Sequence, residues 1–206
     1  MKALIGFEKE FKIISNNLIK EKLNNSVLIS GNKGIGKYFF ITKIIEEYIN
    51  LKVNSDQIDH HLTLLNNNSH PNIKILKKKI EDKTGKVKNN ITIDQIRELN
   101  NFFIETSLIE NFPKFIIIDS ADDLNVSSSN ALLKILEEPK KNSYFFLLSH
   151  HPSTLLLTIK SRCLKLNLPS HKFNNFENIL ISNNFSYDDE ILKLLFDITN
   201  GSPGLS

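Results

Sequence analysis

An apolar run that ends in an acid, at residues 115–119, most constrains the fold of this chain. The run reads Phe-Ile-Ile-Ile-Asp, so both faces of the strand it predicts are apolar. Such a strand is typical of the interior of a parallel sheet that helices cover on both sides. A serine-rich turn and an amphipathic helix stopped by Pro139 follow it. The stretch therefore predicts one strand–turn–helix unit of an α/β protein.

The same alternation of strands and helices continues along the chain. We expect further strands at residues 27–30, 72–80, 144–149 and 164–168. We expect helices at 7–23, 38–49, within 91–109, after a cap at Ser127 to Ser129, at 152–160 with Pro152 in the first turn, at 173–181 and at 188–199. Residues 50–70 read as an irregular connection, with room for a short helix. Residues 1–169 are thus predicted to form a parallel sheet flanked by helices, and residues 170–206 a small helical unit.

Composition excludes some classes of protein. The 206 residues carry a net charge of +3, which does not by itself indicate a nucleic-acid partner. No apolar run reaches the roughly 18 residues that span a bilayer. Cys163 is the only cysteine, which rules out an internal disulfide and a zinc site built from cysteines. We expect a cytoplasmic protein.

Gly31 to Lys37 matches the G-x-x-x-x-G-K pattern of a phosphate-binding loop, between a predicted strand and a predicted helix. Gly31, Gly34 and Gly36 let backbone N–H groups curl around a phosphate, and Lys37 adds a positive charge. The alternative is a plain glycine turn before a helix. Asp119, at the end of its strand, takes the place of the second acid of a nucleotide site, or else only caps that strand.

Two departures from this pattern weaken hydrolysis. Tyr38 occupies the position where a small hydroxyl normally holds magnesium. Ser120 follows Asp119 where a glutamate usually orients the attacking water. We therefore predict that ATP binding is possible, with Gly31, Gly34, Gly36, Lys37, Tyr38 and Asp119 as the binding residues. Magnesium binding is predicted to be weak or absent, and hydrolysis inefficient.

Three other groups need an interpretation. Arg162, in Ser-Arg-Cys, is one of only two arginines, with Arg97, and lysine cannot replace a bidentate guanidinium. It is either a solvated surface residue or a finger that reaches a neighbouring subunit. Glu137 and Glu138 lie at a helix C-terminus, where the helix dipole disfavours acids. They are either a solvated, charged helix end or are placed there for a functional reason. His60, His61 and His70 have irregular spacing, so we predict no metal site.

Taken together, the motifs resemble the delta prime subunit family of the bacterial DNA polymerase III clamp loader, a group of AAA+ proteins. The resemblance covers nearly the whole chain. Its most specific part is Asp119 to Leu124 followed by Asn-Ala-Leu-Leu-Lys-Ile-Leu-Glu-Glu-Pro at 130–139. It also rests on segments 5–8, 31–37, 70–72, 93–97, 161–163 and 201–204.

The resemblance implies an AAA+ domain, a helical lid that is incomplete here, and a collar domain that is missing. It implies a subunit without activity of its own, within a complex that serves DNA-directed DNA polymerase, a nucleotidyltransferase. Arg162 would complete the ATP site of an adjacent gamma/tau subunit. Delta, the sliding clamp and primed DNA are the other implied partners, and the zinc module of many relatives is absent.

Two alternatives stay open. The first is an ATP-hydrolysing clamp-loader subunit of the gamma/tau type. The second is a stand-alone nucleotide-binding adaptor, such as a helicase loader.

Overall fold

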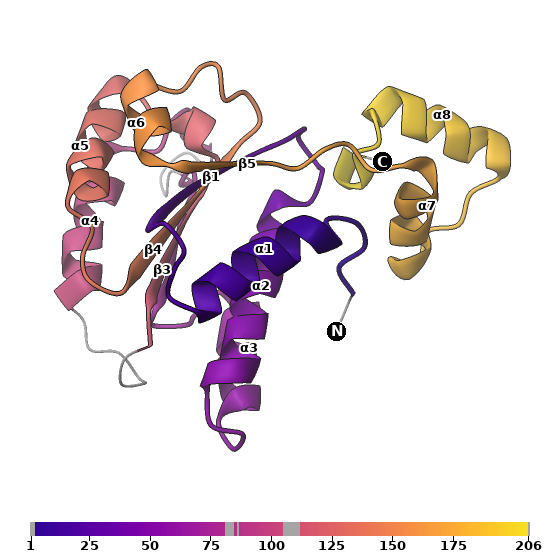
Figure 1. Cartoon of the computed structure of the whole chain (residues 1–206). Helices are drawn as coiled ribbons and strands as arrows, with labels where there is room; N and C mark the ends of the chain where they lie inside the picture. Colours follow the sequence, from indigo (N-terminus) through magenta and orange to yellow (C-terminus); the bar gives the residue numbers. More distant parts are fainter. Residues whose placement is uncertain (1–2, 81–84, 86, 105–111, 206) are drawn as a thin grey trace.

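The computed structural model describes residues 3–80, 85, 87–104 and 112–205. Its core is a parallel sheet of five strands in the order β2-β3-β4-β1-β5. The strands are β1 (Ser26–Ser30), β2 (Ile73–Leu76), β3 (Lys114–Asp119), β4 (Ser143–Ser149) and β5 (Leu164–Asn167). The parallel α/β fold expected from the sequence is confirmed (Figure 1).

Two layers of helices cover the sheet, as the doubly apolar strands require. One layer consists of α1 (Glu8–Ile19), α2 (Lys37–Lys52) and α3 (Ile58–Asn66), and the other of α4 (Ile93–Ile104), α5 (Val126–Glu137) and α6 (Leu157–Arg162). Successive residues of β3 supply opposite cores, because side chains alternate along a strand. Ile117 packs toward the first layer and Ile116 toward the second, and both are fully buried.

The connection at 50–70 contains the short helix α3, for which the prediction left room. Several expected boundaries are wrong. β2 is shorter than the predicted strand at 72–80. Asn125, not the following serines, caps α5, because its Oδ1 accepts a hydrogen bond from the N–H of Ser128 at 2.9 Å. The helix expected from Pro152 begins only at Leu157, since Pro152 lies in a turn. α4 ends at Ile104, and positions 105–109 of the predicted helix lie outside the described residues.

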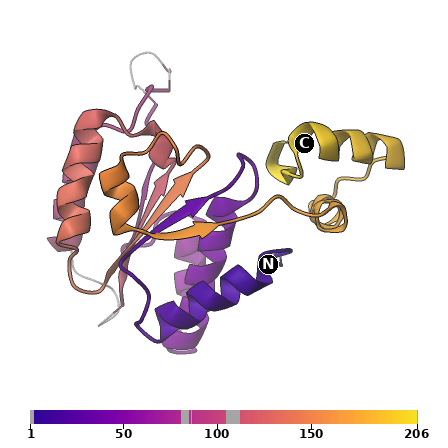
Figure 2. The same ribbon diagram turned by 45° about the horizontal axis from the view of Figure 1, so that its top comes forward.

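The chain leaves the sheet after β5 and forms α7 (Phe173–Ser182), α8 (Asp189–Thr199) and a short 3-10 helix, η2 (Pro203–Leu205). These helices have a small apolar cluster of their own, made of Phe176, Leu180 and Leu192. Figures 1 and 2 show them at the right of the molecule, on the opposite side from the layer of α4, α5 and α6. We call residues 170–205 the lid segment. The exact domain division at residue 169 stays a prediction.

Within the described ranges, no helix has both the length and the apolar character needed to cross a membrane.

Candidate functional site

The glycine loop joins β1 to α2, where a phosphate-binding loop belongs. Gly36 precedes the helix with a φ of 98° and Gly34 has a φ of 75°, backbone conformations that favour glycine. Lys37 begins the helix, and its buried side chain folds back over the loop. Its Nζ donates hydrogen bonds to the carbonyl oxygens of Gly31 and Asn32, at 2.6 and 2.8 Å. The ammonium group thus lies within the loop, where it could bind a phosphate in place of the two carbonyl oxygens.

Burial and nearby acids act on the pKa of Lys37 in opposite directions. Burial lowers its pKa from 10.5 to about 8, although Asp122 and Asp119 oppose the shift through their negative charges. The pKa of Asp119 is itself raised, chiefly by burial, while His150 and Lys37 act against that rise. The two site residues predicted from separate motifs therefore lie close enough to influence each other electrostatically.

The lid segment closes over the glycine loop. The N–H of Gly204 donates to the carbonyl oxygen of Gly34 at 2.9 Å, and a Cβ added at Gly34 would lie only 2.7 Å from Cγ of Leu205. On the other side of the loop, Nε2 of His171 lies 3.2 Å from the carbonyl oxygen of Ile35. Residues of the lid segment thus contact the glycine loop at both Gly34 and Ile35.

A cavity of about 480 Å³ lies beside this contact. Its walls come from the N-terminal segment, the glycine loop, α7 and η2, and include Leu4, Ile5, Phe39, Leu180 and Phe185. A mainly apolar cavity next to a phosphate loop has the chemistry to hold a nucleotide base.

Tyr38 does not point its hydroxyl at the loop's phosphate position in this structure. The hydroxyl donates to Oδ1 of Asn68 at 2.7 Å, and burial raises its pKa. Ser120 is similarly engaged, because its Oγ donates to Oδ2 of Asp122 at 2.8 Å. The loop, Lys37 and the cavity fit a nucleotide, whereas Tyr38 and Ser120 offer neither a small hydroxyl ligand for magnesium nor a carboxylate to orient water.

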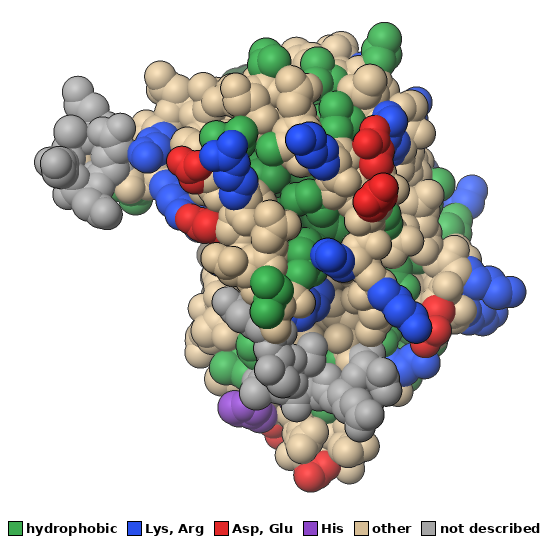
Figure 3. Space-filling view, turned by 90° about the vertical axis from the view of Figure 1, so that its left-hand side faces the viewer, with side chains coloured by type: hydrophobic (Ala, Val, Ile, Leu, Met, Phe, Trp, Pro, Cys, Tyr) green, Lys and Arg blue, Asp and Glu red, His purple; other side chains and the backbone are tan. Residues whose placement is uncertain are grey.

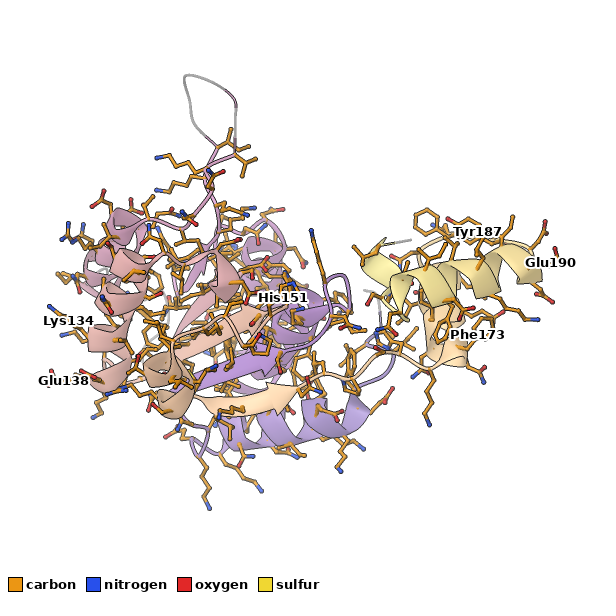
Figure 4. The ribbon with its side chains drawn as sticks, turned by 90° about the horizontal axis from the view of Figure 1, so that it is seen from above. Lys134, Glu138, His151, Phe173, Tyr187 and Glu190 are labelled. Atoms are coloured by element: carbon orange, nitrogen blue, oxygen red, sulfur yellow. The ribbon has the colours of Figure 1, made fainter. Side chains whose placement is uncertain are left out.

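Asp122 is a site residue that the sequence did not single out. It lies in the 3-10 helix at 121–123, just after β3, and joins the ends of β3 and β4. Its carboxylate accepts from Oγ of Ser149 at 2.6 Å and from the N–H groups of His150 and His151 at 2.6 and 3.3 Å. Burial alone would raise its pKa, but these hydrogen bonds and that from Ser120 hold it below the usual value. The labelled His151 in Figure 4 marks this junction, between α5 and the lid segment.

Arg162 lies at the surface at the end of α6, away from the loop. Its NH1 donates to the carbonyl oxygen of Thr158 at 2.9 Å, and its NH2 to Oε1 of Glu137 at 2.6 Å. Its side chain is 35% exposed and that of Glu137 is 48% exposed. Among the described residues, no hydrogen bond or ion pair joins Arg162 to residues 31–37. The structure therefore brings together the loop and Asp119 and leaves Arg162 at a different surface.

The paired glutamates at the end of α5 differ in their surroundings. Glu137 binds Arg162, while Glu138 lines a groove between α4 and α5 with Lys134 and Lys140. Figure 3 looks onto these helices and shows acidic and basic side chains around an apolar seam.

His61 of α3 and His70, which lies just before β2, form a buried pair. Nδ1 of His61 lies 2.9 Å from Nε2 of His70, and Nδ1 of His70 accepts from the N–H of Asn72 at 3.1 Å. Within the described part of the chain, no three histidine, cysteine or acidic residues group as a metal site would require.

Comparison with known proteins agrees with this geometry. Residues 6–172 match the model of the family described as DNA polymerase III, delta subunit. The chain is 31% identical to the DNA polymerase III subunit gamma of Buchnera aphidicola (subspecies Schizaphis graminum), over 98% of this chain and 54% of the relative. It is 28% identical to the subunit delta' of Bacillus subtilis, over 92% of this chain and 55% of the relative. The chain thus spans about half the length of these relatives.

Solved structures support the fold alone, because their sequence identities are low. A gamma subunit-related protein of Thermotoga maritima superimposes with a TM-score of 0.58 at 18% identity, covering 81% of this chain and 49% of that one. The RuvB Holliday junction branch migration motor of the same organism gives 0.58 at 16% identity, covering 98% and 61%. The match over residues 6–172 places this chain in the DNA polymerase III delta subunit family, and its similarity to delta' subunits supports a clamp-loader subunit of the delta' kind.

Proposed function

We propose that this chain acts as a delta prime-like subunit of a DNA polymerase III clamp loader and donates Arg162 to the ATP site of a neighbouring gamma or tau subunit. The position of Arg162 carries the proposal. It is the arginine of Ser-Arg-Cys, it is partly exposed at a helix end, and within the described residues no hydrogen bond or ion pair joins it to residues 31–37. A guanidinium placed in this way suits donation across a subunit boundary, where it would stabilise charge on a transferring phosphoryl group.

The chain's own site supports binding better than hydrolysis. Lys37 and the N–H groups of residues 31–37 would hold phosphates, and the apolar cavity under the lid segment would hold the base. Tyr38 and Ser120 direct their hydroxyls to Asn68 and Asp122 instead. We therefore expect nucleotide to act here as a bound ligand and not as a substrate.

The remaining partners follow from the family. We propose delta as a further subunit of the same ring, and the sliding clamp and primed DNA as partners of the whole complex, in the cytoplasm.

The proposal is tested in a complex reconstituted with the gamma and delta subunits of the same source. Any corresponding arginine of gamma is first replaced by alanine, so that Arg162 is the finger under test. Arg162→Ala should then lower ATP turnover at the affected site by about 10³–10⁵-fold. Arg162→Lys keeps the charge but not the planar fork, so it should remain strongly impaired.

Arg97→Ala is the matched control, assayed without DNA. Arg97 is the other arginine and also pairs with a carboxylate, that of Asp94 at 3.4 Å. It should leave turnover unchanged. Full turnover in the Arg162→Ala complex would remove the proposed role.

A second candidate, an ATPase of the gamma type, is favoured by the 31% identity to the Buchnera gamma subunit over almost the whole chain. Steady-state ATPase measurements on the isolated chain separate the two. Brisk turnover that Lys37→Ala abolishes would establish the gamma type, and no turnover is expected for the delta prime type.

A further inference from the structure

The ion pair between Arg162 and Glu137 joins the ends of two helices that are neighbours in space. Glu137 is the last residue of α5 and Arg162 the last residue of α6. An acid at a helix C-terminus is electrostatically unfavourable, because the helix dipole is negative there. Oε1 of Glu137 lies 2.6 Å from NH2 of Arg162, so the guanidinium charge compensates for the unfavourable position of this acid.

The guanidinium is held at two points from two different elements. The carbonyl of Thr158, one turn earlier in α6, binds NH1, and Glu137 of α5 binds NH2. An arginine side chain has many rotamers, and fixing both terminal nitrogens fixes the plane of its head group. These two bonds use two of the five N–H donors of a guanidinium, so the others can face a ligand.

We propose that Glu137 is a positioning residue for Arg162: it fixes the guanidinium at the surface in the orientation in which it meets a phosphate of the neighbouring subunit. The proposal rests on the proposed function of Arg162. Glu137 itself touches neither the nucleotide nor the reacting atoms.

The exposure of Arg162 and Glu137 indicates whether their ion pair orients the arginine or withholds it from a phosphate. Both side chains are substantially exposed, at 35% and 48%. Ion pairs in contact with water are weak, so this one cannot withhold the arginine from a phosphate that carries several charges. A weak bond still suffices to favour one rotamer of a flexible side chain over many others.

Glu138 provides a matched control. It has the same charge, follows Glu137 directly and is the C-cap residue of the same helix. It lines the groove between α4 and α5 and does not bind Arg162. Figure 4 shows its side chain at the outer side of α5.

The test uses the reconstituted complex described above, with kcat and KM for ATP measured without DNA. Glu137→Ala should lower kcat about tenfold and leave KM within about twofold, because misplacement of a catalytic group acts on the transition state. Glu137→Gln should restore most of the activity, since its amide oxygen still accepts from NH2. Glu138→Ala should behave as wild type.

Other results would overturn the inference. An unchanged kcat in Glu137→Ala removes the positioning role, and a raised kcat shows a lock instead. An equal loss in Glu138→Ala shows a general effect of charge at the helix end. A loss that Gln does not rescue and that accompanies a lower melting temperature shows a merely structural role.

The two proposals fail in distinguishable ways. If Arg162→Ala leaves turnover intact, the proposed function fails. If Arg162→Ala abolishes turnover but Glu137→Ala does not reduce it, only the positioning role of Glu137 fails.

Discussion

The buried pair of His61 and His70 makes the stability of the fold depend on pH. The N–H of Asn72 donates to Nδ1 of His70, so the neutral ring carries its proton on Nε2 and donates it to His61. Charging His70 would break this chain of hydrogen bonds inside the protein. Burial, with the nearby His61 and His60, lowers the pKa of His70 from 6.5 to about 4.

The sign and size of the effect follow from linkage. Between pH 6.5 and 4 the unfolded chain binds a proton at this histidine and the folded chain does not, so stability falls as the pH falls. The contribution is fully present above pH 6.5. At about 1.4 kcal/mol for each pKa unit, the shift lowers the free energy of unfolding by about 3 kcal/mol at pH 4.

Urea unfolding at several pH values between 7.5 and 4.5 measures this loss. Comparison with His70→Asn cancels the contributions of the carboxylates and of the more distant histidines, His150 and His171. The wild type should lose more stability than the variant over this range. The titration of His70 in the wild type, followed by NMR, checks the cause without any mutation. Parallel stability curves, or a His70 that titrates near pH 6.5, would refute the reasoning.

Two further predictions concern Asp122 and Cys163. Asp122→Asn removes the negative charge that accepts four hydrogen bonds. It should lower the free energy of unfolding by about 1–3 kcal/mol. The control, Asp123→Asn, should lower the free energy of unfolding by less. Urea titrations at pH 7.5 that give equal losses would contradict the junction role of Asp122. Burial raises the pKa of Cys163 to about 11, so the native thiol should resist iodoacetamide at pH 8 and react only in urea. Equal labelling rates in both conditions would disprove that expectation.

The sequence predicted the sheet well because the signal for it is local. A run such as residues 115–119 is apolar at every position, and that pattern has few uses other than a strand covered on both faces. The glycine loop was found for the same reason, since its residues are contiguous. Boundaries were less certain: proline is common both in turns and at helix starts, so Pro152 did not fix where α6 begins.

The parts that sequence reasoning missed depend on contacts between distant residues. Asp122 meets Ser149, and Glu137 meets Arg162, across 27 and 25 positions of the chain. No local period marks such pairs. One signal was available for Glu137, because an acid at a helix C-terminus breaks a local rule, but only the fold shows which partner compensates for it.

The hydrogen bond from the N–H of Gly204 to the carbonyl oxygen of Gly34 couples the lid segment to the glycine loop. If an anion changed the turn at Gly34, this bond would pass the change to the segment at 202–205, and a partner that shifted that segment would change anion affinity at the turn. By thermodynamic reciprocity the two effects are equal in free energy. In the proposed role, nucleotide bound at the loop would in this way change the position of the lid segment that a neighbouring subunit meets.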